Sequence, residues 1–159
     1  MKILITFFSA TGKTKKVAEI ISKELNSDLY EIIPEKGYTS EDLNGYNEKS
    51  RTYIEHNTKD SRPKIKDKNA NIEKYDIIFL GFPILWYNAH SIIKTFLESN
   101  SFNNKTIILF GTSGGSQFGD TVKKLNKYVK GAKIIEGKML NRRPSIEELK
   151  KFVNSLKIL

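Results

Sequence analysis

The chain has 159 residues, no cysteine and a formal net charge of +9 at pH 7. This length predicts a single domain spanning residues 1–159, and the lack of cysteine excludes disulfides, thiolate metal sites and cysteine nucleophiles. No secretory segment precedes the first apolar run, and the longest apolar run, residues 77–87, is far short of the roughly 20 residues of a membrane helix; we therefore expect a cytoplasmic protein without a membrane partner.

The first element is an apolar run from Ile3 to Phe8, which is short enough for a strand that is buried on both faces. It ends in a turn with three hydroxyls, and a helical stripe follows from Val17 to Leu25. A strand, a polar turn and a helix direct free backbone N–H groups and the positive end of the helix dipole at an anion. The turn is therefore a candidate phosphate site, in which Ser9, Thr11 and Thr14 can each add a hydroxyl donor.

This turn has three alternative interpretations. Gly12-Lys13-Thr14 matches the end of a P-loop, but that motif needs a glycine where the chain has Phe7. The three spaced glycines of the dinucleotide fingerprint are absent as well. The third alternative, an ordinary turn in which Ser9 or Thr11 only caps the helix, is not distinguished from a phosphate site by the turn alone.

The next elements are a strand over residues 28–33 and a long polar segment. Pro34 ends the strand, and residues 36–71 form a connection that exceeds the usual length. Ser40, Glu41 and Asp42 indicate a helix start within it. Connections of this length are often functional, so the segment is expected to be an elaborate crossover.

The second half of the chain repeats the alternation of strand and helix. Strands are predicted over residues 75–81, 106–110 and 132–135, and helical stripes over residues 92–97 and 122–129. A capping box at Ser145 and Glu148 begins a last helix. This alternation predicts an α/β fold, a three-layer doubly wound sandwich with a five-stranded parallel sheet and helices on both faces.

Three of the predicted strands end in unusual loops. The first is the hydroxyl-rich turn, the second (83–89) is aromatic, and the third (112–118) is rich in glycine and hydroxyls. Ligands of doubly wound sheets bind beyond the carboxyl ends of the strands, where the strand order reverses. Together the loops suit a ligand with a phosphate and a flat aromatic part, which describes FMN.

At this point the chain resembles the flavodoxins, and in particular a branch of small stand-alone bacterial proteins. The matching motifs are Ser9-Ala-Thr-Gly-Lys-Thr14, Gly81-Phe-Pro-Ile84 with Trp86, Thr95-Phe-Leu-Glu98 and Thr112-Ser-Gly-Gly-Ser116. The resemblance covers essentially the whole chain. It implies the strand order 2-1-3-4-5 and FMN as the cofactor, at the switch point that is already known for flavodoxins.

The resemblance also implies which residues bind FMN. Those expected at the phosphate are Ser9, Ala10, Thr11, Gly12, Lys13 and Thr14. Those expected on one side of the isoalloxazine ring are Pro83, Ile84, Leu85, Trp86, Tyr87 and Asn88. Those expected on the other side are Thr112, Ser113, Gly114, Gly115 and Phe118.

The aromatic loop departs from the family pattern. The branch usually has two adjacent tryptophans and then a glycine, whereas this chain has Leu85-Trp86-Tyr87 and no glycine between Pro83 and Ala89. We expect Asn88 to take left-handed backbone angles there, because asparagine tolerates them better than most residues. His90, where the branch often has proline, is expected to face solvent in the first turn of a helix.

The resemblance and the residues leave three functions open. The first is an FMN-binding redox protein, a flavodoxin, that transfers electrons between partner proteins; the second is an FMN-dependent NAD(P)H oxidoreductase that reduces quinones, flavins or nitro compounds. No acid pair, nucleophile–base pair or metal cluster is visible, so no catalytic and no metal residue is predicted. The third function is a nucleic-acid or protein-binding module with an empty site, and only the basic charge of the chain supports it. The basic surface favours acidic redox partners over nucleic acid, since no nucleic-acid motif accompanies it.

Overall fold

The structure is a computed structural model that describes residues 1–113, 115–141 and 144–158. Its sheet contains five parallel strands in the order β2-β1-β3-β5-β6. Their bounds are β1 (Ile3–Phe7), β2 (Asp28–Glu31), β3 (Ile77–Leu85), β5 (Thr106–Thr112) and β6 (Lys133–Met139). The two-residue strand β4 (Asn88–Ala89) pairs antiparallel with the end of β3. Without β4, the five strands follow the predicted order 2-1-3-4-5, and the predicted fold class is confirmed.

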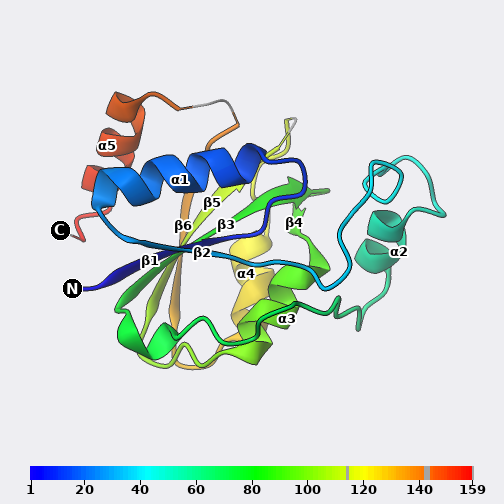
Figure 1. Ribbon diagram of the computed structural model, residues 1–159, viewed down its shortest axis with the longest axis horizontal. Helices are drawn as coiled ribbons and strands as arrows, with labels where there is room; N and C mark the ends of the chain where they lie inside the picture. The colour runs from blue at the N-terminus through cyan, green and yellow to red at the C-terminus, as the bar shows by residue number, and fades with distance from the viewer. Residues whose placement is uncertain (114, 142–143, 159) are drawn as a thin grey trace.

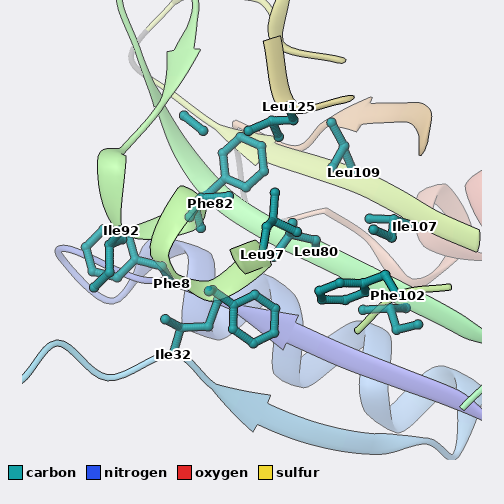
Figure 2. Close-up of a cluster of buried hydrophobic side chains, with 14 of the residues drawn as sticks. Phe8, Ile32, Leu80, Phe82, Ile92, Leu97, Phe102, Ile107, Leu109 and Leu125 are labelled. Carbon is teal, nitrogen blue, oxygen red and sulfur yellow. The ribbon is translucent and has the colours of Figure 1, made fainter. Parts of the chain in front are cut away.

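Helices cover both faces of the sheet (Figure 1). Helices α1 (Lys13–Leu25) and α5 (Ile146–Ser155) lie on one face, and α3 (Ser91–Ser99) and α4 (Thr121–Leu125) lie on the other. Side chains of β3 alternate between the two hydrophobic cores: Ile77 and Phe79 point to the α1 side, whereas Leu80 and Phe82 point to the α3 side. Figure 2 shows the α3-side core, in which Phe82 and Leu97 lie among strand residues such as Leu109.

Several boundaries differ from the sequence predictions. Strand β3 runs past Gly81 to Leu85 because its last residues pair with β4, and β6 extends to Met139. Helix α4 ends at Leu125 and continues as a 3₁₀ turn, η2 (Asn126–Tyr128). Another 3₁₀ turn, η1 (Ile72–Lys74), precedes β3.

The helix start predicted at residues 40–42 is wrong. Thr39 and Asp42 do form reciprocal hydrogen bonds of the capping-box type, at 2.9 and 3.1 Å, but only a single turn follows them. Asn44 and Gly45 come next, and both residue types disfavour helix continuation. The helix of this segment is α2 (Arg51–Asn57), where the Ser50 hydroxyl accepts a hydrogen bond from the Tyr53 N–H at 3.2 Å.

The segment between β2 and β3, residues 36–64, forms a closed excursion. Its ends are joined by backbone hydrogen bonds from Glu35 to Lys64 (2.8 Å) and from Lys66 to Ile33 (2.9 Å). Figure 1 shows α2 beyond the carboxyl ends of the strands, at the opposite end of the molecule from both termini. No helix in the described part of the chain is long and apolar enough to cross a membrane.

Candidate functional site

The carboxyl ends of β1, β3 and β5 meet at one edge of the sheet. The register pairs Phe7 with Gly81 and Pro83 with Thr112, so the three loops that follow these strands adjoin one another. A pocket of about 210 Å³ lies among them. The predicted site residues that line it are Ala10, Thr11, Lys13, Thr14, Pro83, Ile84, Leu85, Thr112 and Ser113.

The turn between β1 and α1 leaves backbone donors available. Gly12 has φ 92°, a left-handed angle that glycine adopts at no steric cost, and this angle turns the chain into α1. The Ser9 hydroxyl accepts from the N–H groups of Gly12 (3.0 Å) and Lys15 (3.2 Å). Ser9 therefore caps the helix, as one of the alternatives predicted, and its own O–H remains able to donate. Within the described residues, the N–H groups of Thr11 and Lys13 make no hydrogen bond.

A buried hydrogen bond joins the first and third loops. The hydroxyls of Thr14, in α1, and Thr112, at the end of β5, are 2.9 Å apart. Both residues are almost fully buried and both line the pocket. This bond holds the start of α1 against the end of β5, so the two loops are held in place before any ligand binds.

The middle loop is a tight β-hairpin. Trp86 (φ 47°) and Tyr87 (φ 58°) form its turn, and both have the left-handed backbone angles of a two-residue hairpin turn. The prediction that Asn88 takes these angles is wrong, because Asn88 pairs with Leu85 in β4 and is extended. The pairing of β3 with β4 thus places two bulky aromatic residues where glycine and asparagine are usual.

This hairpin predicts opposite effects of glycine at neighbouring positions. A left-handed residue with a Cβ costs roughly 1–2 kcal/mol more than glycine there. We therefore expect the free energy of unfolding of Tyr87→Gly to be about 1 kcal/mol higher than that of Tyr87→Ala. At Asn88, which is in a strand, Asn88→Gly should be less stable than Asn88→Ala. Urea unfolding of the four variants tests this, and a Gly–Ala difference of the same sign at both positions would contradict it.

The aromatic side chains of the hairpin lie outside the pocket. The Trp86 ring packs against His56 of α2, with ring centroids 4.6 Å apart, and against Tyr53 at 5.8 Å. Tyr87 is 56% exposed and lies against Gly119, where an added Cβ would be 2.8 Å from the Tyr87 Cβ. Trp86, Tyr87 and Asn88 are therefore not among the pocket-lining residues, and Trp86 instead attaches the hairpin to the excursion.

The third loop contributes its first two residues to the pocket. The Ser113 hydroxyl donates to the Ser116 carbonyl (2.7 Å) and accepts from the Gly115 N–H (3.1 Å), which keeps the loop compact. Gly115 is exposed away from the pocket. Phe118, which was expected beside the ring, is only 4% exposed and lies in the α3-side core. Gly114, also a predicted site residue, lies outside the described residues.

Three pocket residues were not predicted from the sequence: Leu43, Thr52 and His90. Leu43 and Thr52 come from the excursion, whose unusual length was the only sequence signal for them. His90 does not face solvent as predicted: it is 7% exposed, and its ring lies edge-on to Phe8 at 5.3 Å. Burial, and secondarily His56, lowers the His90 pKa from 6.5 to about 4, so the imidazole is neutral at pH 7.

The described lining of the pocket carries one charged side chain, Lys13. The neighbouring Lys15 instead faces Glu31 of β2, with Nζ and Oε2 3.7 Å apart. No acidic side chain is among the described residues of the lining. The pocket thus has a cation and helix N–H groups at its α1 end, and neutral or apolar groups elsewhere.

A larger hollow, of about 410 Å³, lies on the other side of Lys13. It is bounded by α1 residues such as Val17 and Ile20 and by Leu140 and Asn141, and it includes no residue of the hairpin or the excursion. The smaller pocket brings together all three strand-end loops. We therefore assign the candidate ligand site to the smaller pocket.

Comparisons with known proteins agree with this geometry. A family model described as flavodoxin matches residues 2–156. The flavodoxin-like domain-containing protein BilS of Clostridioides difficile is 30% identical over 119 residues, a match that covers 75% of this chain and 51% of BilS. The chain spans about half the length of the curated relatives that it matches.

Two solved structures are similar over nearly the whole chain. A protein from Bacteroides eggerthii that is assigned as a flavoprotein is 40% identical, with a TM-score of 0.92 and coverage of 99% of both chains. A flavoprotein from Lactobacillus acidophilus, solved in complex with FMN, is 25% identical, with a TM-score of 0.72 and coverage of 96% of this chain and 98% of that one.

Proposed function

This chain belongs to the flavodoxin family, and from that premise we propose that it binds FMN and transfers electrons between partner proteins. The observation that carries the proposal is the pocket where the three strand-end loops converge, which has helix N–H groups, hydroxyls and a cation at one end. The FMN complex of the Lactobacillus flavoprotein supports the choice of cofactor.

The residues of the pocket suit FMN. Thr11, Lys13 and Thr14, at the start of α1, would hold the phosphate through N–H groups, hydroxyls and the Lys13 ammonium. Pro83, Ile84 and Leu85 offer an apolar surface to the isoalloxazine ring. Bound FMN supplies one- and two-electron redox chemistry, and the protein binds the cofactor, orients it and tunes its potentials.

A hydroxyl deletion at Thr14 tests the cofactor site. Thr14→Ala removes a donor to a charged acceptor, worth about 1.5–3 kcal/mol, so FMN affinity should fall roughly tenfold or more. Thr14→Ser keeps the hydroxyl and is the matched control, with affinity expected near wild type. Fluorescence titration of FMN measures both, and equal affinity of Thr14→Ala and wild type would remove the phosphate assignment.

The alternative activity is an FMN-dependent NAD(P)H oxidoreductase on the same fold. The carrier is favoured because the chain has no dinucleotide fingerprint, and because the described pocket lining contains no carboxylate for proton transfer. Anaerobic addition of NADPH or NADH to the FMN-loaded protein distinguishes the two functions. Direct bleaching of the flavin would favour the enzyme.

The surface charge bears on the partners of a carrier. The net charge of +9 and the absence of Asp and Glu from residues 7–16, 82–93 and 111–119 favour redox partners with an acidic docking face. Association that weakens as salt rises would support this part of the proposal.

A further inference from the structure

We propose that Thr52 and His90 form a hydrogen-bonding subsite of this pocket for the riboflavin part of the cofactor. The inference rests on the proposed function, because it takes FMN as the ligand. Both residues line the pocket, and neither belongs to the four motifs that carry the sequence resemblance.

Thr52 carries a polar atom without a partner. Its side chain is 2% exposed, and its Oγ1 has no hydrogen-bond partner in the described part of the chain. A buried hydroxyl normally finds a partner. Thr52 is the second residue of α2, so the carbonyl four residues earlier lies outside the helix and is not placed to accept its hydrogen bond. The Thr52 hydroxyl thus remains unsatisfied in a residue that lines the pocket, where rotation of the side chain would bring it to a ligand atom.

His90 adds a second neutral polar group to the same wall. Within the described residues, its ring nitrogens make no hydrogen bond, and the ring is held by edge contacts with Phe8 (5.3 Å) and Tyr38 (6.3 Å). A neutral imidazole offers one donor and one acceptor. The donor and the acceptor of the imidazole match the carbonyls and N–H of the isoalloxazine and the hydroxyls of the ribityl chain.

The position of Thr52 is fixed by contacts of α2 with its surroundings. Arg51 forms an ion pair with Glu55 at 2.7 Å, and its guanidinium lies 3.8 Å from the centre of the Tyr38 ring. Tyr38 donates to Glu55 at 2.6 Å, and the Ser91 hydroxyl of α3 donates to the Glu55 carbonyl at 3.1 Å. Helix α2, and with it the backbone of Thr52, is therefore held in place before a ligand binds, which reduces the entropy lost on binding.

The two residues come from other elements than the groups expected at the phosphate. Thr11, Lys13 and Thr14 belong to the first turn and α1, whereas Thr52 belongs to α2 and His90 directly precedes α3. The pocket crosses the strand ends between them, and Pro83, Ile84 and Leu85 line it. A ligand with its phosphate at α1 would extend its riboflavin part toward Thr52 and His90, where the described lining offers no cation.

The test compares FMN and riboflavin binding in three variants. Thr52→Val keeps the shape of the side chain and removes the hydroxyl, so both ligands should bind about tenfold more weakly. Lys13→Gln should weaken FMN but not riboflavin, because Lys13 is the one charged residue of the described pocket lining and is assigned to the phosphate. The control is Thr6→Val in β1, which removes another buried hydroxyl without a partner, outside the pocket lining, and should leave both affinities unchanged.

Stability of the cofactor-free protein provides a second readout. Thr52→Val removes a buried hydroxyl that has no partner, so its melting temperature without cofactor should equal or exceed that of wild type. Loss of affinity with retained stability is then a binding effect and not misfolding. His90→Phe, which keeps a ring but no polar atom, should also weaken both flavins.

The outcomes separate this inference from the proposed function. If wild type binds neither flavin, the proposed function is wrong and the inference fails with it. If wild type binds FMN but Thr52→Val binds it equally well, or loses FMN affinity alone, the subsite is wrong and the proposed function stands. Binding of FMN without measurable binding of riboflavin would also overturn the subsite.

Discussion

Lowering the pH from 7 to 4.5 is expected to destabilise the cofactor-free protein through His90. Burial depresses the His90 pKa from 6.5 to about 4 in the folded state, so the unfolded chain binds more protons between these values. The contribution of neutral His90 to the free energy of unfolding is therefore fully present above pH 6.5 and is lost as the pH falls toward 4. The shift corresponds to about 3 kcal/mol over the full window.

His90→Gln isolates this contribution, because it removes the titrating group and keeps a neutral polar side chain. Urea unfolding at pH 7 and pH 4.5 should show a loss in wild type that exceeds the loss in His90→Gln by about 2–3 kcal/mol. Carboxylates titrate in both proteins, so their effects cancel in this difference. The pKa of His56 is also lowered, by burial first and then by Lys124 and Lys94, so His56→Gln serves as the comparison at a more exposed site. An equal pH dependence of wild type and His90→Gln would show that His90 is not buried as neutral imidazole.

The second large effect concerns the charge of Lys13. If the chain binds FMN as proposed, two-electron reduction would leave an anionic flavin, and the phosphate of the same cofactor would oppose this by charge repulsion. A unit charge at about 9 Å and an effective dielectric near 20 contributes roughly 2 kcal/mol. Lys13 is the one charged residue of the described pocket lining, so it should offset part of the repulsion.

Redox titration of the FMN-loaded protein measures this effect. With saturating FMN at low ionic strength, Lys13→Gln should lower the potential of the second electron by up to about 90 mV. Lys13 is exposed, so salt near 0.15 M should reduce the shift in potential to less than half of its value at low ionic strength. Lys15→Gln is the matched control, because Lys15 faces Glu31 and does not line the pocket. Equal potentials in wild type and Lys13→Gln would show that loop structure, and not charge, sets the potential.

The pattern of residues along the chain was enough to predict the fold class and the edge of the sheet that carries the candidate site. Apolar runs of strand length alternate with helical stripes, and buried parallel strands leave few other arrangements of the chain. The hydroxyl-rich turn after Phe8 and the loops after β3 and β5 were identified because polar and glycine residues replace apolar ones where each strand ends. These signals are local, so they can be read without knowing which segments meet.

Which residues line the pocket could not be predicted from local patterns. His90 is buried because Phe8 and Tyr38, from distant parts of the chain, pack against its ring. Thr52 reaches the pocket because polar and aromatic contacts hold the excursion against the start of α3. The left-handed turn falls on Trp86 and Tyr87, and not on Asn88, because pairing between β3 and β4 sets the register of the hairpin. Each outcome depends on contacts between segments far apart in sequence or on strand register, which residue type and periodicity do not encode.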